Sequence, residues 1–199
     1  RNVILKDSEG YKLAKDTREI EIPETIQEIV LARVDRLKEH SKMTLQAASV
    51  IGREFTLRLL AKKEELEREL KRYMQELKHL ELVQEKSLFP EIEYIFKNAV
   101  TKDVVYGSLL LKHRKELHKR IAEAIERLYG EKLEDYLEML AYHYLNSDTS
   151  DKTIFYLIKA GGKAKSIYAN NEAIEYFQKA LDLMDQNNGS SDDLKKEAH

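Results

Sequence analysis

The sequence contains no cysteine and no tryptophan, and its 199 residues include only 2 prolines and 7 glycines. Without cysteine the chain forms no disulfide and has neither a thiolate metal ligand nor a cysteine nucleophile. Helix-breaking residues are few, and hydrophobic residues make up 42% and charged residues 35% of the chain. This composition is typical of a helix-rich globular protein. The sequence therefore predicts a mainly α-helical chain with few strands.

An excess of one charge is also missing, since 34 basic residues stand against 36 acidic ones and the formal net charge is -2. Nothing in this balance indicates a polyanionic partner or a membrane surface. The chain lacks an apolar run near the roughly 18 residues that cross a bilayer, and its first residues do not form a signal peptide. We therefore expect a cytoplasmic protein without membrane contact. Because the chain begins at Arg1 and not at Met, we expect it to be a piece of a longer protein.

The first 97 residues carry several short helical patterns followed by two runs that alternate like strands. The predicted helices are 23–40, 44–51 with Gly52 as its cap, 56–60 and 64–80, and the predicted strands are 11–16, 82–86 and 91–97. Helices followed by a hairpin outline a winged helix. We therefore assign 1–97 to a winged-helix-like domain with an N-terminal extension.

From residue 98 onward the pattern is helical throughout, and we assign 98–199 to a second, tetratricopeptide-like α-solenoid domain that is truncated at its C-terminus. Helices predicted at about 151–168 and 171–185 resemble a tetratricopeptide repeat, a helix hairpin of roughly 34 residues. The residues that carry the match are Gly161, Ala173, Phe177 and Ala180. Small residues let the paired helices approach closely, and Phe177 fills the gap between them. A flexible break is expected at 187–191.

Three stretches in order carry a wider resemblance: IPETIQ (22–27) leading into LARVDRL (31–37), then ASVIGREF (48–55), then YIFK (94–97). Together they resemble the region downstream of the nucleotide-binding domain in STAND-type, AAA-like signal-transduction ATPases. Members of that group are often joined to adenylate or guanylate cyclase domains and carry a winged helix followed by tetratricopeptide-like helices. The chain departs from the pattern at Asn98, where similar sequences usually carry histidine.

The resemblance implies a non-catalytic arm that transmits the nucleotide state of an upstream ATPase domain and offers a surface to a protein or peptide partner. ATP-Mg would bind only to that upstream domain, so no cofactor is expected in this chain. No G-x-x-x-x-G-K-[ST] phosphate loop occurs, and GGKAKS at 161–166 has the wrong spacing for one. His113 and His118 are five residues apart and face different sides of a helix, so no metal site is expected. No catalytic residue is expected either.

A DNA-binding winged helix is the alternative function. Against it, the helix predicted at 64–80 opens with Glu64, Glu65, Glu67 and Glu69, whose carboxylates would repel phosphates. The basic run at 112–120 is tempered by neighbouring glutamates and is typical of a solvated helix face. We therefore expect the chain to bind neither DNA nor ATP.

The candidate partner-surface residues are Tyr142, Tyr144 and Tyr168, because tyrosine supplies binding area at a low cost in conformational entropy. The alternative is that these tyrosines belong to the core. The repeat-like hairpin is expected to hold a partner in a groove that further repeats would complete. Apolar surface left uncovered by a truncated repeat predicts self-association of this chain.

Overall fold

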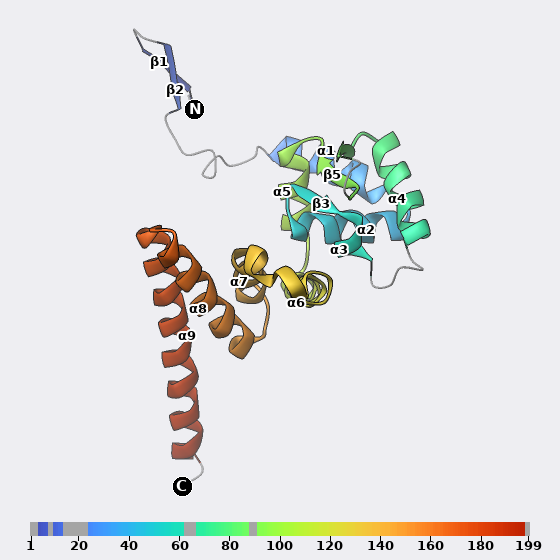
Figure 1. The fold of residues 1–199 in the computed structure, drawn as a ribbon. Helices are drawn as coiled ribbons and strands as arrows, with labels where there is room; N and C mark the ends of the chain where they lie inside the picture. The colour runs from blue at the N-terminus through green and yellow to red at the C-terminus, as the bar shows by residue number, and fades with distance from the viewer. Residues whose placement is uncertain (1–3, 8–9, 14–23, 62–66, 88–90, 198–199) are drawn as a thin grey trace.

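The computed structural model describes residues 4–7, 10–13, 24–61, 67–87 and 91–197, with side chains for 26–61, 68–87 and 91–186 (Figure 1). The described chain is mainly helical with a small three-stranded antiparallel sheet, as its composition predicts. Within the described residues, none of the helices combines the length and the apolar character that crossing a membrane requires.

A two-stranded antiparallel hairpin of β1 (Ile4–Asp7) and β2 (Gly10–Leu13) forms the N-terminal end. The alternation at 11–16 is confirmed as a strand up to Leu13, and residues 14–16 lie outside the described part of the chain. The sequence does not predict the partner strand β1.

The two helices predicted at 23–40 and 44–51 form as α1 (Glu24–Asp35) and α2 (Glu39–Ile51), but the predicted position of the break between them is wrong, because it lies at 36–38. Between them Leu37 is buried and its N–H donates to the Val34 carbonyl, a tight turn that redirects the chain. The glycine cap is confirmed: Gly52 ends α2 with φ at +152°, which favours glycine, and its N–H donates to the Ala48 carbonyl.

Gly52 leads into a short strand, β3 (Glu54–Thr56), and a one-turn helix, α3 (Leu57–Leu60). The helix predicted at 56–60 is confirmed, but the Thr56 side chain makes no capping hydrogen bond. The sequence does not predict β3, because three residues are too few to show alternation.

The next elements are α4 (Glu67–His79), β4 (Val83–Ser87) and β5 (Glu93–Phe96), which confirm the helix and the two strands predicted there. The antiparallel sheet has the order β3–β5–β4, and β5 pairs with both neighbours. Tyr94 lies opposite Phe55 and Phe96 lies opposite Val83. These buried side chains turn one face of the sheet towards the core.

Helices then follow to the end of the described chain: α5 (Ala99–Gly107), α6 (Leu111–Leu128), the 3-10 segment η3 (Gly130–Tyr136), α7 (Leu137–Leu145), α8 (Ser150–Ser166) and α9 (Asn170–Glu197). Asn98, where the chain departs from the resembling sequences, caps α5, since its Oδ1 accepts the N–H of Val100 at 2.9 Å. α5 packs against α1 and α2, and α6 packs against α2, α3 and α7.

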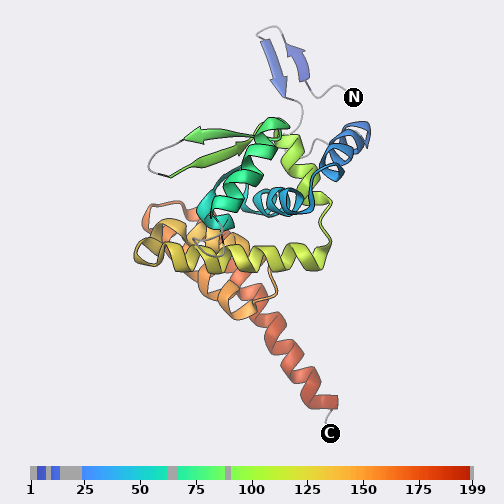
Figure 2. The same cartoon turned by 90° about the vertical axis from the view of Figure 1, so that its right-hand side faces the viewer.

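The flexible break expected at 187–191 is wrong, because α9 continues through it to Glu197. Gly189 costs only about 1 kcal/mol in a helix interior, and α9 contains no proline to interrupt its hydrogen bonds. As a result α9 extends past the N-terminal end of α8 and projects from the rest of the molecule in Figure 2.

Candidate interaction surface

The repeat-like hairpin is formed by α8 and α9, which pack along one another. Gly161 faces Phe177, and a Cβ atom placed on Gly161 would lie 2.8 Å from the Phe177 ring. Ala173 and Ala180 are only 4% and 2% exposed, and helical spacing puts them on the same side of α9 as Phe177. The structure therefore brings Gly161 and Phe177 into contact and buries both alanines.

A tight turn joins the two helices. Tyr168 adopts φ at +62°, and the N–H of Ala169 donates back to the Ala164 carbonyl at 2.9 Å. The Tyr168 side chain is 87% exposed. It therefore lies on the surface, and its role as a partner contact stays a prediction.

Of the other two candidate tyrosines, Tyr142 is about half exposed and Tyr144 is buried. The Tyr144 ring stacks on the ring of Tyr156 with 5.3 Å between centroids and 5° between planes. The prediction that Tyr144 lines a partner surface is therefore wrong, because the packing of α7 against α8 encloses its ring.

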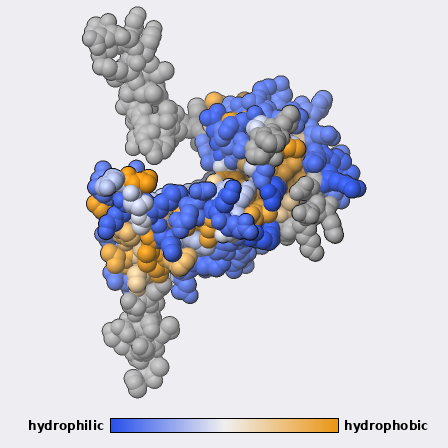
Figure 3. All heavy atoms as spheres, viewed as in Figure 1, coloured by the Kyte–Doolittle hydropathy of each residue, from blue (hydrophilic) through white to orange (hydrophobic). Residues whose placement is uncertain are grey.

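One side of the α8–α9 hairpin is covered by α7, and the opposite side carries exposed apolar side chains. Helical spacing places Ile158 of α8 beside Gly161, and Ile174 and Leu181 of α9 beside Phe177, whereas Phe155 lies further around α8 on its exposed side away from α7. We call this side the open face, and its residues are Phe155, Ile158, Ile174, Leu181 and Met184. Figure 3 shows hydrophobic side chains gathered over α8 and α9.

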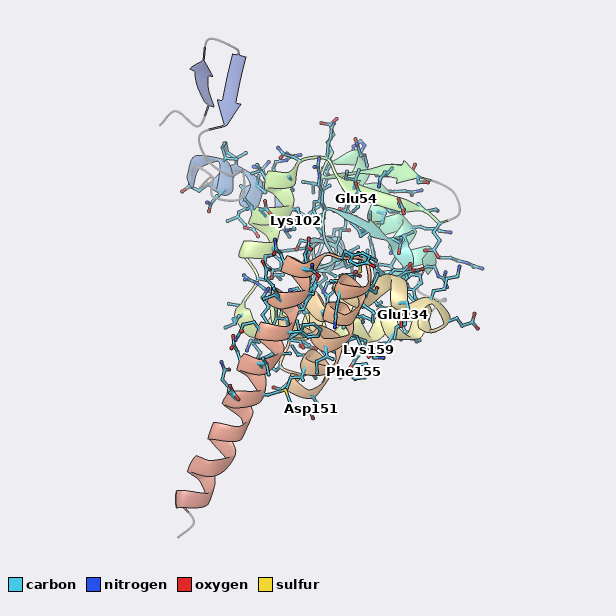
Figure 4. The ribbon with its side chains drawn as sticks, turned by 60° about the vertical axis from the view of Figure 1, so that its left-hand side comes forward. Glu54, Lys102, Glu134, Asp151, Phe155 and Lys159 are labelled. Atoms are coloured by element: carbon cyan, nitrogen blue, oxygen red, sulfur yellow. The ribbon has the colours of Figure 1, made fainter. Side chains whose placement is uncertain are left out.

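Charged side chains border the open face. Along α8, Asp151, Phe155 and Lys159 follow one another at intervals of one turn (Figure 4), and the Lys159 ammonium lies 5.8 Å from the Phe155 ring centroid. The open face therefore combines apolar area with an exposed cation, which suits a partner segment that carries apolar side chains and a carboxylate.

A carboxylate holds α8 against the preceding helices. Glu126 on α6 accepts hydrogen bonds from the Lys152 ammonium and the Tyr156 hydroxyl, each at 2.7 Å. The same ammonium donates to the Tyr144 hydroxyl on α7 at 3.0 Å. Burial raises the pKa of the Glu126 carboxyl, but hydrogen bonds from these groups outweigh burial and lower it overall. The ionised carboxylate thus joins three helices.

A second polar cluster, which the sequence does not predict, lies between α6 and α7. The Nδ1 atoms of His118 and His143 are 2.9 Å apart, so one ring donates a hydrogen bond to the other, and the Tyr106 hydroxyl is 3.0 Å from His118 Nε2. Burial lowers the pKa of His118 to about 4, aided by the charges of Arg114 and Lys102, and lowers that of His143 to about 3. Both rings are therefore neutral at pH 7.

Some side chains of the basic run at 112–120 make contacts within the chain, and others are exposed to solvent. Arg114 donates to the carbonyls of Gly107 and Leu109 and lies 4.4 Å from the Tyr106 ring centroid. Lys115 pairs with Asp148 at 2.6 Å. His118 is buried whereas His113 is half-buried at the edge of a cavity, so the two histidines do face different sides of α6.

No group of three or more histidine, aspartate or glutamate side chains suited to a metal ion occurs within the described residues. The GGKAKS stretch lies inside α8, where Gly161 packs on Phe177. The sequence matches no protein-family model, and no curated protein and no solved structure matches the chain.

Proposed function

We propose that the chain is a non-catalytic protein-interaction and signal-transmission arm of a larger cytoplasmic signalling ATPase of the STAND type. The order α2, β3, α3, α4, β4, β5, with β5 central in the sheet, supports a winged helix in the first half. The Gly161–Phe177 contact supports a tetratricopeptide-like hairpin in the second. The boundary near residue 97 remains a prediction.

The open face is the observation that carries this proposal. Its large apolar side chains are exposed, and Figure 3 shows hydrophobic side chains gathered over α8 and α9. Exposed apolar area of this kind marks interaction sites on soluble proteins. The Glu126 contacts connect α8 to α6 and α7, so a partner bound on α8 would act on helices that reach α2 and α3.

Sedimentation equilibrium tests the open face, because in the absence of a partner it should associate with a second copy. We expect an apparent mass that rises with concentration and a Leu181→Glu variant that stays monomeric. Leu110→Glu is the control, since Leu110 is 79% exposed against 54% for Leu181 but lies immediately before α6 and outside the open face. A wild-type chain that is monomeric throughout, or an equal effect of both variants, would remove the support for the proposal.

Duplex DNA binding is the second candidate function, favoured by the exposed face of α4. Helical spacing puts five exposed side chains, one of them acidic, on the face opposite the buried Met74 and Leu77. They are Arg68, Glu69, Arg72, Gln75 and His79, and the exposed Lys71 lies at the edge of this face. Of the other acidic residues of this helix, Glu76 accepts a hydrogen bond from Ser41, whereas Glu64, Glu65 and the Glu67 side chain lie outside the described part.

Fluorescence anisotropy with a labelled duplex distinguishes the two functions. A DNA-binding α4 predicts micromolar affinity at about 50 mM salt that falls steeply by about 200 mM, because phosphate contacts release counterions. Arg72→Glu should then weaken binding far more than Lys119→Glu on α6. An absence of binding at low salt would exclude this second function and leave the first untouched.

A further inference from the structure

A groove runs between α6 and the helices α2, α3 and α4, away from the open face. It consists of two adjoining cavities of about 360 Å³ and 310 Å³. Four residues line both cavities and make the groove continuous: Ala47, Leu60, Leu117 and Arg120.

The floor of this α4–α6 groove is apolar. Leu117 is buried in it, Ala47, Leu60 and Leu70 are partly covered, and the Met43 side chain is 49% exposed. Along α6 the lining extends from His113 to Arg127, which corresponds to about 21 Å at 1.5 Å per residue. A groove of this length accommodates a helix of about 14 residues.

Arg120 is the charged group at the centre of the groove. Its side chain is only partly exposed, and no acidic side chain lies within salt-bridge distance of it among those the structure describes. His113 and Arg127 mark the two ends of the lining on α6, while Glu69 and Glu123 lie on the rim. A partly desolvated guanidinium binds a carboxylate strongly because two of its N–H groups can donate in parallel.

We propose that the α4–α6 groove binds an amphipathic helix of a partner protein. Apolar side chains of that helix, spaced at three and four residues, cover the floor, and a carboxylate from its flank pairs with Arg120. A helix fits because it satisfies its own backbone hydrogen bonds on an apolar floor.

This site is distinct from the open face, because it is formed by α2, α3, α4 and α6 and includes no residue of α8 or α9. A helix in the groove would contact α4 and α6 together.

The probe is a displayed library of helix-forming peptides of about 14 residues, with leucine at every third or fourth position and randomised residues between. Peptides selected on the complete chain are synthesised, and their affinities are measured by fluorescence anisotropy. We expect the selected peptides to carry a glutamate or aspartate at a common position.

Two substitutions locate the binding site. Ala47→Trp fills the floor and should abolish binding, and Arg120→Glu should weaken binding by at least about tenfold. Lys119→Glu, an exposed neighbour on α6, should change affinity less than about twofold. Replacing the selected acidic residue of the peptide by lysine should restore binding to Arg120→Glu, a rescue that requires this variant to be folded.

Peptides that bind Ala47→Trp and Arg120→Glu as tightly as the parent would overturn the proposal, and so would a selection that enriches nothing. Peptides that lose affinity only in Leu181→Glu would place binding on the open face. That result would contradict the groove site while leaving the proposed function intact.

Discussion

Gly161 sets the distance between α8 and α9, because the Phe177 ring occupies the space where a side chain would begin. Gly161→Ala should destabilise the protein by about 1 to 2 kcal/mol, since the overlap outweighs the roughly 1 kcal/mol gained in helix propensity. Gly162→Ala is the matched control, because its Cβ would meet nothing within 4 Å, and this variant should gain stability. Urea unfolding measures both.

A double variant separates contact from propensity. In a Phe177→Ala background the obstacle is gone, so Gly161→Ala should become stabilising, as Gly162→Ala is. If both glycine variants gained equal stability in the wild-type background, the Phe177 ring would move aside without a loss of stability. The hairpin would then not depend on this packing.

The histidine pair makes stability depend on pH. The folded pKa values of His118 and His143 lie below the ordinary value of 6.5, so the unfolded chain binds more protons as pH falls. The contribution of the two histidines to the free energy of unfolding is complete above pH 6.5 and is lost as the pH falls towards 4. The free energy of unfolding then changes by about 1.4 kcal/mol per pH unit for each histidine. The pair is surrounded by Arg114, Lys102, Tyr106 and Tyr142. The charges of Arg114 and Lys102 oppose a positive charge on the rings, and the neutral tyrosines leave such a charge unpaired.

Urea unfolding at several pH values tests this dependence. His143→Leu should reduce the pH dependence of the free energy of unfolding between pH 6.5 and pH 4 by about 1.4 kcal/mol per pH unit, which corresponds to about one proton. His113→Gln, on the same helix as His118 but outside the pair, should leave it unchanged. A profile that His143→Leu does not alter would refute the assignment.

Among the elements, α8 is held to α6 and α7 by the Glu126 carboxylate. Glu126→Gln keeps the shape but loses the charge, and it should destabilise the protein by about 1 to 3 kcal/mol because the hydrogen bonds from Lys152 and Tyr156 weaken. Glu123→Gln, one turn earlier and exposed, should change stability by less than about 0.5 kcal/mol. Thermal unfolding of both variants compares them, and equal losses would contradict the role of Glu126.

Helices with long periodic patterns could be predicted from the sequence, and elements defined by tertiary packing could not. The α8–α9 contact could be predicted from the sequence because Gly161 and Phe177 belong to consecutive helices with a known spacing. β3 is too short to show a period, and the split between α1 and α2 depends on the burial of Leu37.

The sites that the sequence does not reveal are assembled from distant residues. His118 and His143 are 25 positions apart, and the groove draws on four helices. Their proximity follows from how α6 packs, which no local pattern encodes. Tyr144 is a prediction from residue type that failed. Tyrosine is a common residue of binding surfaces, but this one is buried where its ring stacks on Tyr156.

On the scale of the whole molecule, one continuous core joins the two proposed domains. The buried residues from Val30 on α1 to Ala180 on α9 form a single cluster. Val105 on α5 is fully buried where this helix packs against α1 and α2, although it follows the boundary predicted near residue 97.

We therefore expect the described body to unfold in one cooperative transition. Removing either half would expose the apolar surface of the other, so neither half should melt separately. Calorimetry should give equal calorimetric and van't Hoff enthalpies, with far-UV circular dichroism and tyrosine fluorescence changing together. Two resolved transitions would instead favour independent domains.

The unequal lengths of α8 and α9 have a mechanical consequence. At 1.5 Å per residue, α9 is roughly 42 Å long and α8 about 26 Å, so any tilt of α9 about the turn at Tyr168 would grow towards its far end. A tilt of about 10° at this turn would carry the far end of α9 sideways by about 7 Å, given that length. A small rearrangement beside the Gly161–Phe177 contact would thereby displace the far end of α9 by more than the size of a side chain.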